Sequence, residues 1–270
     1  MLVTDRVIDE LGITEPHEID IEAIAWHLGA KVKYCQVDGC EACILGGSDK
    51  AIIRVSDKVR RQRQRFSIGH ELGHWCHHRR RALYCKPEDI GSLGAGKPTA
   101  KRTEEKVADT YASNLLMPWK VFKPVAKQFK SLNFDTVTQV ATAFETSLTA
   151  TAIRLIDMDH TPALLVSYGP KGRKWFARSK SVPERWFPRD EVHRDSPSFD
   201  VLYGKASESK TVCKIEADTW FDRYGADRYE ITEQTRRAPD DSILTLLVIK
   251  DEAMLSDDDH DARGWSGKRR

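Results

Sequence analysis

One short stretch of the chain concentrates residues that could bind a metal. Residues 65–78 read RFSIGHELGHWCHH and hold four of the nine histidines. Within this stretch, His70, Glu71 and His74 form the pattern H-E-x-x-H. Residues four apart on a helix share a face, so both imidazoles can bind the same divalent ion. The pattern therefore predicts a metal site, with Glu71 placed to act as general base toward a water bound there.

The same stretch is expected to form a helix with two different faces. Ile68, Leu72 and Trp75 recur at helical spacing on the side away from the two histidines, where they can pack into a core. Gly69 and Gly73 lie within this helix, where each glycine costs about 1 kcal/mol relative to alanine. We expect them to permit the close approach of another backbone, either a second helix or a bound peptide.

Catalytic zinc normally has three protein ligands, so the third must come from another element. Residues 103–118, TEEKVADTYASNLLMP, have the pattern of a helix with acidic residues in its first turn and proline at its end. Glu105 and Asp109 are four positions apart and share a face. Glu105 could complete the ligand set, and Asp109 could accept the free ring N–H of a ligating histidine. Glu104, about 100° around the helix, is the alternative ligand.

Three further side chains are candidates near the metal. His77 and His78 compete as third ligands, although the glycine turn and more distant histidine of the metzincin pattern are absent from the sequence. We interpret both as residues that surround the site or face solvent. Tyr111 and His77 are candidates for stabilising the oxyanion of peptide hydrolysis. The ligand types favour zinc, and manganese can occupy such a site.

The composition is that of an ordinary globular protein. The chain has 270 residues, of which 40% are hydrophobic and 31% charged, and its net charge of +2 neither demands nor excludes a nucleic-acid partner. No apolar run of about 18 residues could span a membrane, and no secretory signal is recognisable. Six cysteines without an export signal suggest reduced thiols and a cytoplasmic location. The oligomeric state stays open.

The character of the sequence changes near residue 160. Before it we expect helices and a small antiparallel meander whose last strand, residues 51–55, could align a peptide by β-addition. After it, the β-prone runs ALLVSYG, RKWFARS, KTVCKIEA and SILTLLVIK alternate with loops. We predict an α+β fold with three parts: a domain over 1–158 that includes helix-turn-helix-like helices over 133–156, a smaller β-rich domain over 159–256, and a disordered tail over 257–270.

Together these motifs resemble the ImmA/IrrE metallopeptidase family. The resemblance rests on RQRFSIGHELGHWCHH and EEKVADTYASNLLMP, preceded by LGAKVKY and KAIIRVS, and covers roughly residues 15–157. It implies a zincin-like domain with a gluzincin-like zinc site, in which His70, His74 and Glu105 are ligands and Glu71 is the general base. It also implies a protein substrate, because better-known members cleave helix-turn-helix repressors of the lambda-repressor-like class. That cleavage relieves repression of mobile-element or DNA-damage genes.

The resemblance includes two departures. Members often have asparagine where this chain has Asp109, and phenylalanine where it has Tyr111. A radiation-response member carries a GAF-like sensor domain after its catalytic part. A GAF-like fold is therefore one expectation for residues 159–256.

Two other classes of function are kept as alternatives to a site-specific endopeptidase. One is a DNA-binding regulator whose metal is structural, although the second helix of TVTQVATAFETSLTATAIRL offers only one basic residue to DNA. The other is an interaction protein similar to one half of a toxin–antitoxin pair. We favour an endopeptidase that acts on a regulatory protein, with its second domain gating activity or selecting the substrate.

Overall fold

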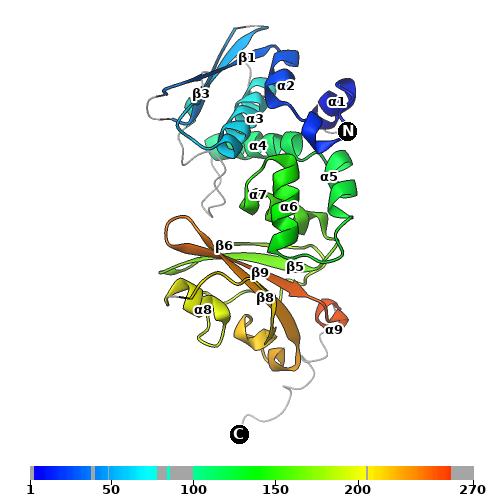
Figure 1. Cartoon of the computed structure of the whole chain (residues 1–270), viewed down its shortest axis with the longest axis vertical. Coiled ribbons are helices and arrows are strands. Elements are labelled where there is room, and N and C mark those ends of the chain that lie inside the picture. The colour runs from blue at the N-terminus through cyan, green and yellow to red at the C-terminus, as the bar shows by residue number, and fades with distance from the viewer. Residues whose placement is uncertain are drawn as a thin grey trace. The chain divides into compact units, whose positions relative to one another are not determined.

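The structure is a computed structural model that describes residues 3–37, 40–47, 49–77, 84–85, 100–204 and 206–256 (Figure 1). It contains helices and two β-sheets, which confirms an α+β fold. The chain divides into two compact units, residues 1–130 with 138–151 and residues 131–137 with 152–270. The division after residue 158 stays a prediction, and the predicted tail lies outside the described residues.

The sheet of the first unit is mixed, so the prediction of an antiparallel meander is wrong. Its strands β1 (Ala30–Cys35), β2 (Ala42–Gly46), β3 (Ala51–Ser56) and β4 (Tyr84–Cys85) lie in the order β1-β3-β2-β4. β3 is parallel to β1 and antiparallel to β2. Turn residues indicate where a chain reverses but not which strand becomes the neighbour. β3 takes the inner position, where Ile53 and Val55 are completely buried.

The inner position of β3 has a second consequence. Because β3 has a neighbour on each side, neither of its edges is free to pair with a peptide. The expectation that this strand aligns a substrate by β-addition is therefore also wrong.

Among the described residues, five helices lie entirely within the first unit. They are α1 (Val3–Glu10), α2 (Ile21–His27), α3 (Arg61–His77), α4 (Ala100–Leu116) and α5 (Trp119–Ala126), with a short 3-10 turn η1 (Pro16–Glu18). α3 contacts β2 and β3 through one face and α4 through another (Figure 1). Its predicted apolar face is confirmed, because Ile68 and Leu72 are fully buried and Trp75 is nearly so. The Trp75 indole also donates to the Leu28 carbonyl at 2.9 Å.

Two helices follow that lie partly in each unit. They are α6 (Phe134–Phe144) and α7 (Leu148–Met158), and they coincide with the range expected to resemble a helix-turn-helix. The connection between them is only three residues long and begins with Glu145, whose φ of 50° is unusual for a residue with a side chain. The structure therefore contains the two helices, while their likeness to a DNA-binding motif stays a prediction.

The second unit is built on a five-stranded antiparallel sheet in the order β6-β5-β9-β8-β7. Its elements are β5 (Ala163–Gly169), β6 (Gly172–Arg178), α8 (Pro197–Leu202), β7 (Cys213–Glu216), η2 (Ala217–Thr219), η3 (Ala226–Arg228), β8 (Glu230–Ala238), β9 (Ser242–Ile249) and α9 (Glu252–Leu255). Every residue of β5 and β9 is buried, so both faces of the sheet are covered. Trp220, Phe221 and Tyr168 are among the largest side chains of its core.

Sequence patterning missed β8, because all of its buried side chains except that of Ile231 are polar. Glu233 is only 1% exposed and accepts hydrogen bonds from the Trp220 indole at 2.8 Å and from the hydroxyls of Ser196 and Ser198. The Ser198 backbone N–H also donates to it at 3.0 Å. A buried carboxylate needs such donors to replace water. The alternation of apolar and polar residues that indicates a strand is therefore absent from β8.

Candidate metal centre

The two histidines of the H-E-x-x-H pattern lie one turn apart on α3, in the interior of the first unit. The exposed fraction is 0% for His70 and 2% for His74. Their Nε2 atoms are 3.0 Å apart, and the rings meet edge to face with centroids 4.7 Å apart. Both imidazoles thus lie on one face of α3 with their Nε2 atoms close together, as the four-residue spacing predicts.

Glu105 of α4 completes the cluster from a second helix. Its Oε2 atom lies 3.1 Å from Nε2 of His70 and 3.5 Å from Nε2 of His74. Ligand atoms of a tetrahedral zinc site with bonds of about 2.0–2.1 Å are about 3.3 Å apart. The three donor atoms therefore match the edges of such a site, and their chemistry suits zinc.

This cluster is distinctive within the part of the chain that the structure describes. Only His70, His74 and Glu105 form a group of three or more His, Cys, Asp or Glu side chains whose ligand atoms approach one another within 4.8 Å. The structure thus brings Glu105, rather than Glu104, to the imidazoles. His78 lies outside the described residues.

Asp109 lies one turn beyond Glu105 on α4 and contacts the other ring nitrogen of His70. Its Oδ1 atom is 2.8 Å from Nδ1 of His70. With the Nδ1 proton donated to this carboxylate, the lone pair of Nε2 faces Glu105 and His74. This is the arrangement that keeps a ligating histidine in the correct tautomer and orientation.

Burial and hydrogen bonding act in opposite directions on the pKa values of His70 and Glu105 in the metal-free protein. Burial disfavours the imidazolium of His70, but the hydrogen bonds with Asp109 and Glu105 outweigh it and raise the pKa to about 9. Burial likewise opposes ionisation of Glu105, yet the hydrogen bonds with His70 and His74 lower its pKa to about 2. In the metal-free protein these shifts favour the imidazolium form of His70 beside the Glu105 carboxylate.

Glu71 is completely buried and lies next to His70 on α3. Its charge contributes to the raised pKa of His70, after burial and the hydrogen bonds named above. It also contributes to the raised pKa of the Cys43 thiol on β2, for which burial is the main cause. The carboxyl group of Glu71 is therefore close to the cluster but is not one of its three ligand groups.

Tyr111 and His77 make contacts within the packing of α3 against α4. The Tyr111 hydroxyl accepts a hydrogen bond from the Cys76 thiol at 3.4 Å, and its ring meets that of His77 edge to face at 5.4 Å. His77 Nδ1 donates to the carbonyl of Gly73 at 3.0 Å. Sequence reasoning did not predict the contact between Cys76 and Tyr111, because no spacing rule connects the two residues. An oxyanion role for Tyr111 or His77 stays a prediction.

The glycines of α3 explain how α4 comes close enough to deliver Glu105. A Cβ atom at Gly73 would lie 2.8 Å from Cα of Ala108, and one at Gly69 would lie 3.1 Å from Cβ of Ala112. Real Cβ contacts are essentially never as short as the first of these distances. The expectation that these glycines admit a second helix is confirmed.

Comparisons with known proteins agree with this geometry. A family model for peptidases of class M78, described as the IrrE N-terminal-like domain, matches residues 17–156, which is more than half of the chain and includes every residue of the cluster. No curated protein matches the chain.

Among solved structures, a chain titled Mycobacterium tuberculosis transcriptional regulator is similar with a TM-score of 0.56 and 14% identity, over 93% of this chain and 75% of that chain. At this identity the similarity shows a common fold alone. None of the helices in the described ranges combines the length and apolar character that a membrane crossing requires.

Proposed function

This chain belongs to the IrrE N-terminal-like family of M78 peptidases, and from that premise we propose that it is a metal-dependent endopeptidase. One observation carries the proposal: the nitrogen and oxygen atoms of His70, His74 and Glu105 converge at 3.0–3.5 Å from two helices. Three protein ligands leave a fourth position for water, which is the arrangement of catalytic rather than structural zinc.

We infer the following roles. His70, His74 and Glu105 would hold zinc, or manganese where it is supplied. When bound, the metal would lower the pKa of a coordinated water and polarise the scissile carbonyl. Glu71 would accept the proton of the attacking water and later donate it to the departing amine. Asp109 would hold the ring of His70 in place through Nδ1.

We propose a regulatory protein as the substrate, of the helix-turn-helix repressor class, whose cleavage would relieve transcriptional repression. The family assignment supports a protein substrate. The proposed reaction takes place in the cytoplasm, which agrees with the free thiols of Cys35, Cys40, Cys43, Cys76 and Cys213.

A DNA-binding regulator is the second candidate, because the structural neighbour is titled a transcriptional regulator. A recognition helix must present polar or basic side chains to the major groove. On α7, however, the only arginine is Arg154, and it is 6% exposed. Its burial favours the peptidase over a regulator that reads DNA through this helix.

The test incubates the metal-loaded protein with the repressor encoded beside its gene and follows both cleavage and bound metal. We expect Glu71→Gln to retain zinc and lose cleavage, and Glu105→Ala to lose both. Glu104→Ala is the matched control on the neighbouring position and should retain both. Cleavage at the normal rate by Glu71→Gln would refute the proton route. A stable complex without cleavage would favour an interaction protein, and tight duplex binding without cleavage would favour the regulator.

A further inference from the structure

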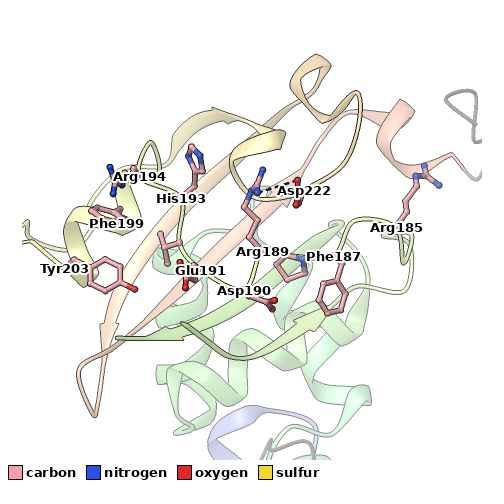
Figure 2. Close-up of a pocket in the computed structure, with 12 residues that line it drawn as sticks. Arg185, Phe187, Arg189, Asp190, Glu191, His193, Arg194, Phe199, Tyr203 and Asp222 are labelled. Atoms are coloured by element: carbon pink, nitrogen blue, oxygen red, sulfur yellow. Dashed lines mark ion pairs between the residues drawn. The ribbon is translucent and has the colours of Figure 1, made fainter. Parts of the chain in front are cut away.

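The second unit contains a cavity of about 800 Å³ that the proposed peptidase reaction does not use (Figure 2). It is lined by Arg185 and residues 187–194, which belong to the connection between β6 and α8, together with Phe199, Tyr203 and Asp222. We call it the 185–194 cavity. It lies outside the range 17–156 that matches the peptidase family, so any function of this cavity belongs to the second unit.

The segment that forms the cavity is held firmly by the rest of the unit. The Arg173 backbone N–H donates to the Asp190 carbonyl at 2.7 Å, and the Arg189 backbone N–H donates to the Trp220 carbonyl at 2.9 Å. The buried Tyr168 hydroxyl donates to the Arg189 carbonyl. The Arg173 guanidinium donates to the Pro188 carbonyl. A segment fixed in this way loses little conformational freedom when it binds a ligand.

Arg189, which lines the cavity, and Arg173, which lies on β6 outside the lining, are both paired. The Arg173 guanidinium contacts the Asp190 carboxylate at 2.6 Å. Arg189 donates to the Asp218 carbonyl at 2.9 Å and lies 3.6 Å from the Asp222 carboxylate. These contacts neutralise Arg173 and Arg189 and leave them with a mainly structural role.

Two other arginines lack a carboxylate partner among the described residues. Arg185 donates only to main-chain carbonyls, those of Met254 and Ser256. Arg194 is exposed and makes no ion pair in the described ranges. Among the carboxylates that line the cavity, that of Glu191 likewise makes no ion pair with a described residue. Among the charged lining groups that make no ion pair with a described residue, two are guanidinium groups and one is the Glu191 carboxylate, so these groups together carry one positive charge in excess.

Aromatic rings complete the walls of the cavity. Tyr203 is 46% exposed and packs against Phe199 with ring centroids 4.9 Å apart. Phe187 is 53% exposed, and the Arg173 guanidinium supports its ring at 4.4 Å. Figure 2 shows Tyr203, Phe199 and Arg194 at one end of the cavity and Phe187 and Arg185 toward the other. Each end therefore combines an exposed aromatic ring with an arginine that has no acidic partner.

We propose that the 185–194 cavity binds an anionic ligand with a planar ring, of the nucleotide class. A guanidinium group is well suited to a phosphate, because its donors match the phosphate oxygens. An exposed aromatic ring provides a surface on which a base can stack. At one end of the cavity, Arg194 supplies the guanidinium group and Tyr203 supplies the exposed ring. Glu191 can accept a hydrogen bond from an amino group of a base.

The experiment measures binding to the full chain by equilibrium dialysis, with ATP, adenosine and inorganic pyrophosphate as separate probes. Saturable ATP binding is expected, and adenosine and pyrophosphate should each bind at least about tenfold more weakly because each lacks one half of the ligand. The double variant Arg194→Gln/Tyr203→Ala should weaken ATP binding by about tenfold or more. Glu71→Gln should bind ATP normally, so failure of the peptidase proposal does not affect this result.

A matched control pair is available in the same unit. The Arg228 guanidinium lies 5.8 Å from the ring centroid of Tyr224, which is 77% exposed, and neither residue lines the cavity. Arg228→Gln/Tyr224→Ala should leave ATP binding unchanged. The proposal is overturned if ATP does not bind saturably, if pyrophosphate or adenosine binds as tightly as ATP, or if both double variants change binding equally. Thermal unfolding of both variants shows that each remains folded.

Discussion

The Oδ1 atom of Asp109 lies 2.8 Å from Nδ1 of His70, while Nε2 of the same ring lies 3.1 Å from the Glu105 carboxylate. One helix, α4, therefore contacts both nitrogens of a histidine on α3, through two carboxylates that are four residues apart. A ligand held in this way enters the metal site in a single orientation. The first two predictions follow from this contact.

Removing the Asp109 carboxylate should weaken metal binding without removing a ligand. We expect Asp109→Ala to lower zinc affinity about 10- to 100-fold, because the His70 ring loses its fixed tautomer and orientation. Competition with a chelator of known affinity measures the change. Asp109→Asn keeps an acceptor for the Nδ1 proton and should retain most of the affinity. Equal affinities for Asp109→Ala and the unmodified protein would show that the contact does not position the ligand.

The metal-free protein should be most stable at mildly acidic pH. The His70 pKa is raised from 6.5 to about 9, so its contribution to stability is complete below pH 6.5 and is lost as the pH rises through 9. The Glu105 pKa is lowered from 4.5 to about 2, so its contribution is complete above pH 4.5 and is lost as the pH falls through 2. Both contributions are present in full between pH 4.5 and 6.5.

Urea unfolding of chelator-treated protein checks this profile. The unfolding midpoint should fall as the pH rises from about 6 to about 9.5. The His70→Asn variant lacks the imidazole, so its unfolding midpoint should decrease less over this pH interval. A midpoint that rises over the same interval would contradict the sign of the His70 shift.

Gly73→Ala should destabilise the protein, although alanine favours a helix. The added Cβ would lie 2.8 Å from Cα of Ala108, so α3 and α4 would have to separate. Overpacking of this kind costs about 1–3 kcal/mol, which exceeds the gain of about 1 kcal/mol in helix propensity. Urea unfolding measures the difference, and zinc affinity should fall with it because Glu105 moves with α4. Gly47→Ala, where a Cβ meets nothing within 4 Å, is the control.

Trp220→Phe should destabilise the second unit more than Trp186→Phe. Both indoles are buried and donate one hydrogen bond, that of Trp220 to the Glu233 carboxylate at 2.8 Å and that of Trp186 to the Met254 carbonyl at 2.6 Å. A hydrogen bond to a charged group contributes about 1.5–3 kcal/mol, and one between neutral groups about 0.5–1.5 kcal/mol. Both variants lose similar volume, so the difference between their unfolding free energies isolates the charge of Glu233. Equal losses would indicate that Glu233 does not depend on this donor.

The arrangement of the candidate metal centre could be predicted from the sequence to the extent that it depends on spacing within single helices. Four-residue spacing placed His70 and His74 on one face of α3, and the same spacing placed Glu105 and Asp109 on one face of α4. The apolar residues opposite the histidines likewise predicted which face of α3 is buried. These are local properties, set by the geometry of an α-helix whatever surrounds it.

Contacts between segments that are distant in the sequence were determined only by the tertiary structure. No local rule pairs β1 with β3 across the chain between them, and none indicates that β8 buries the Glu233 carboxylate among hydroxyl and indole donors. The 185–194 cavity is of the same kind, since its lining residues come from a loop, from α8 and its C-terminal end, and from the segment after η2. Spacing along the chain determines which residues share a face of one helix or strand. Contacts between helices and strands depend instead on how all of them pack around one core.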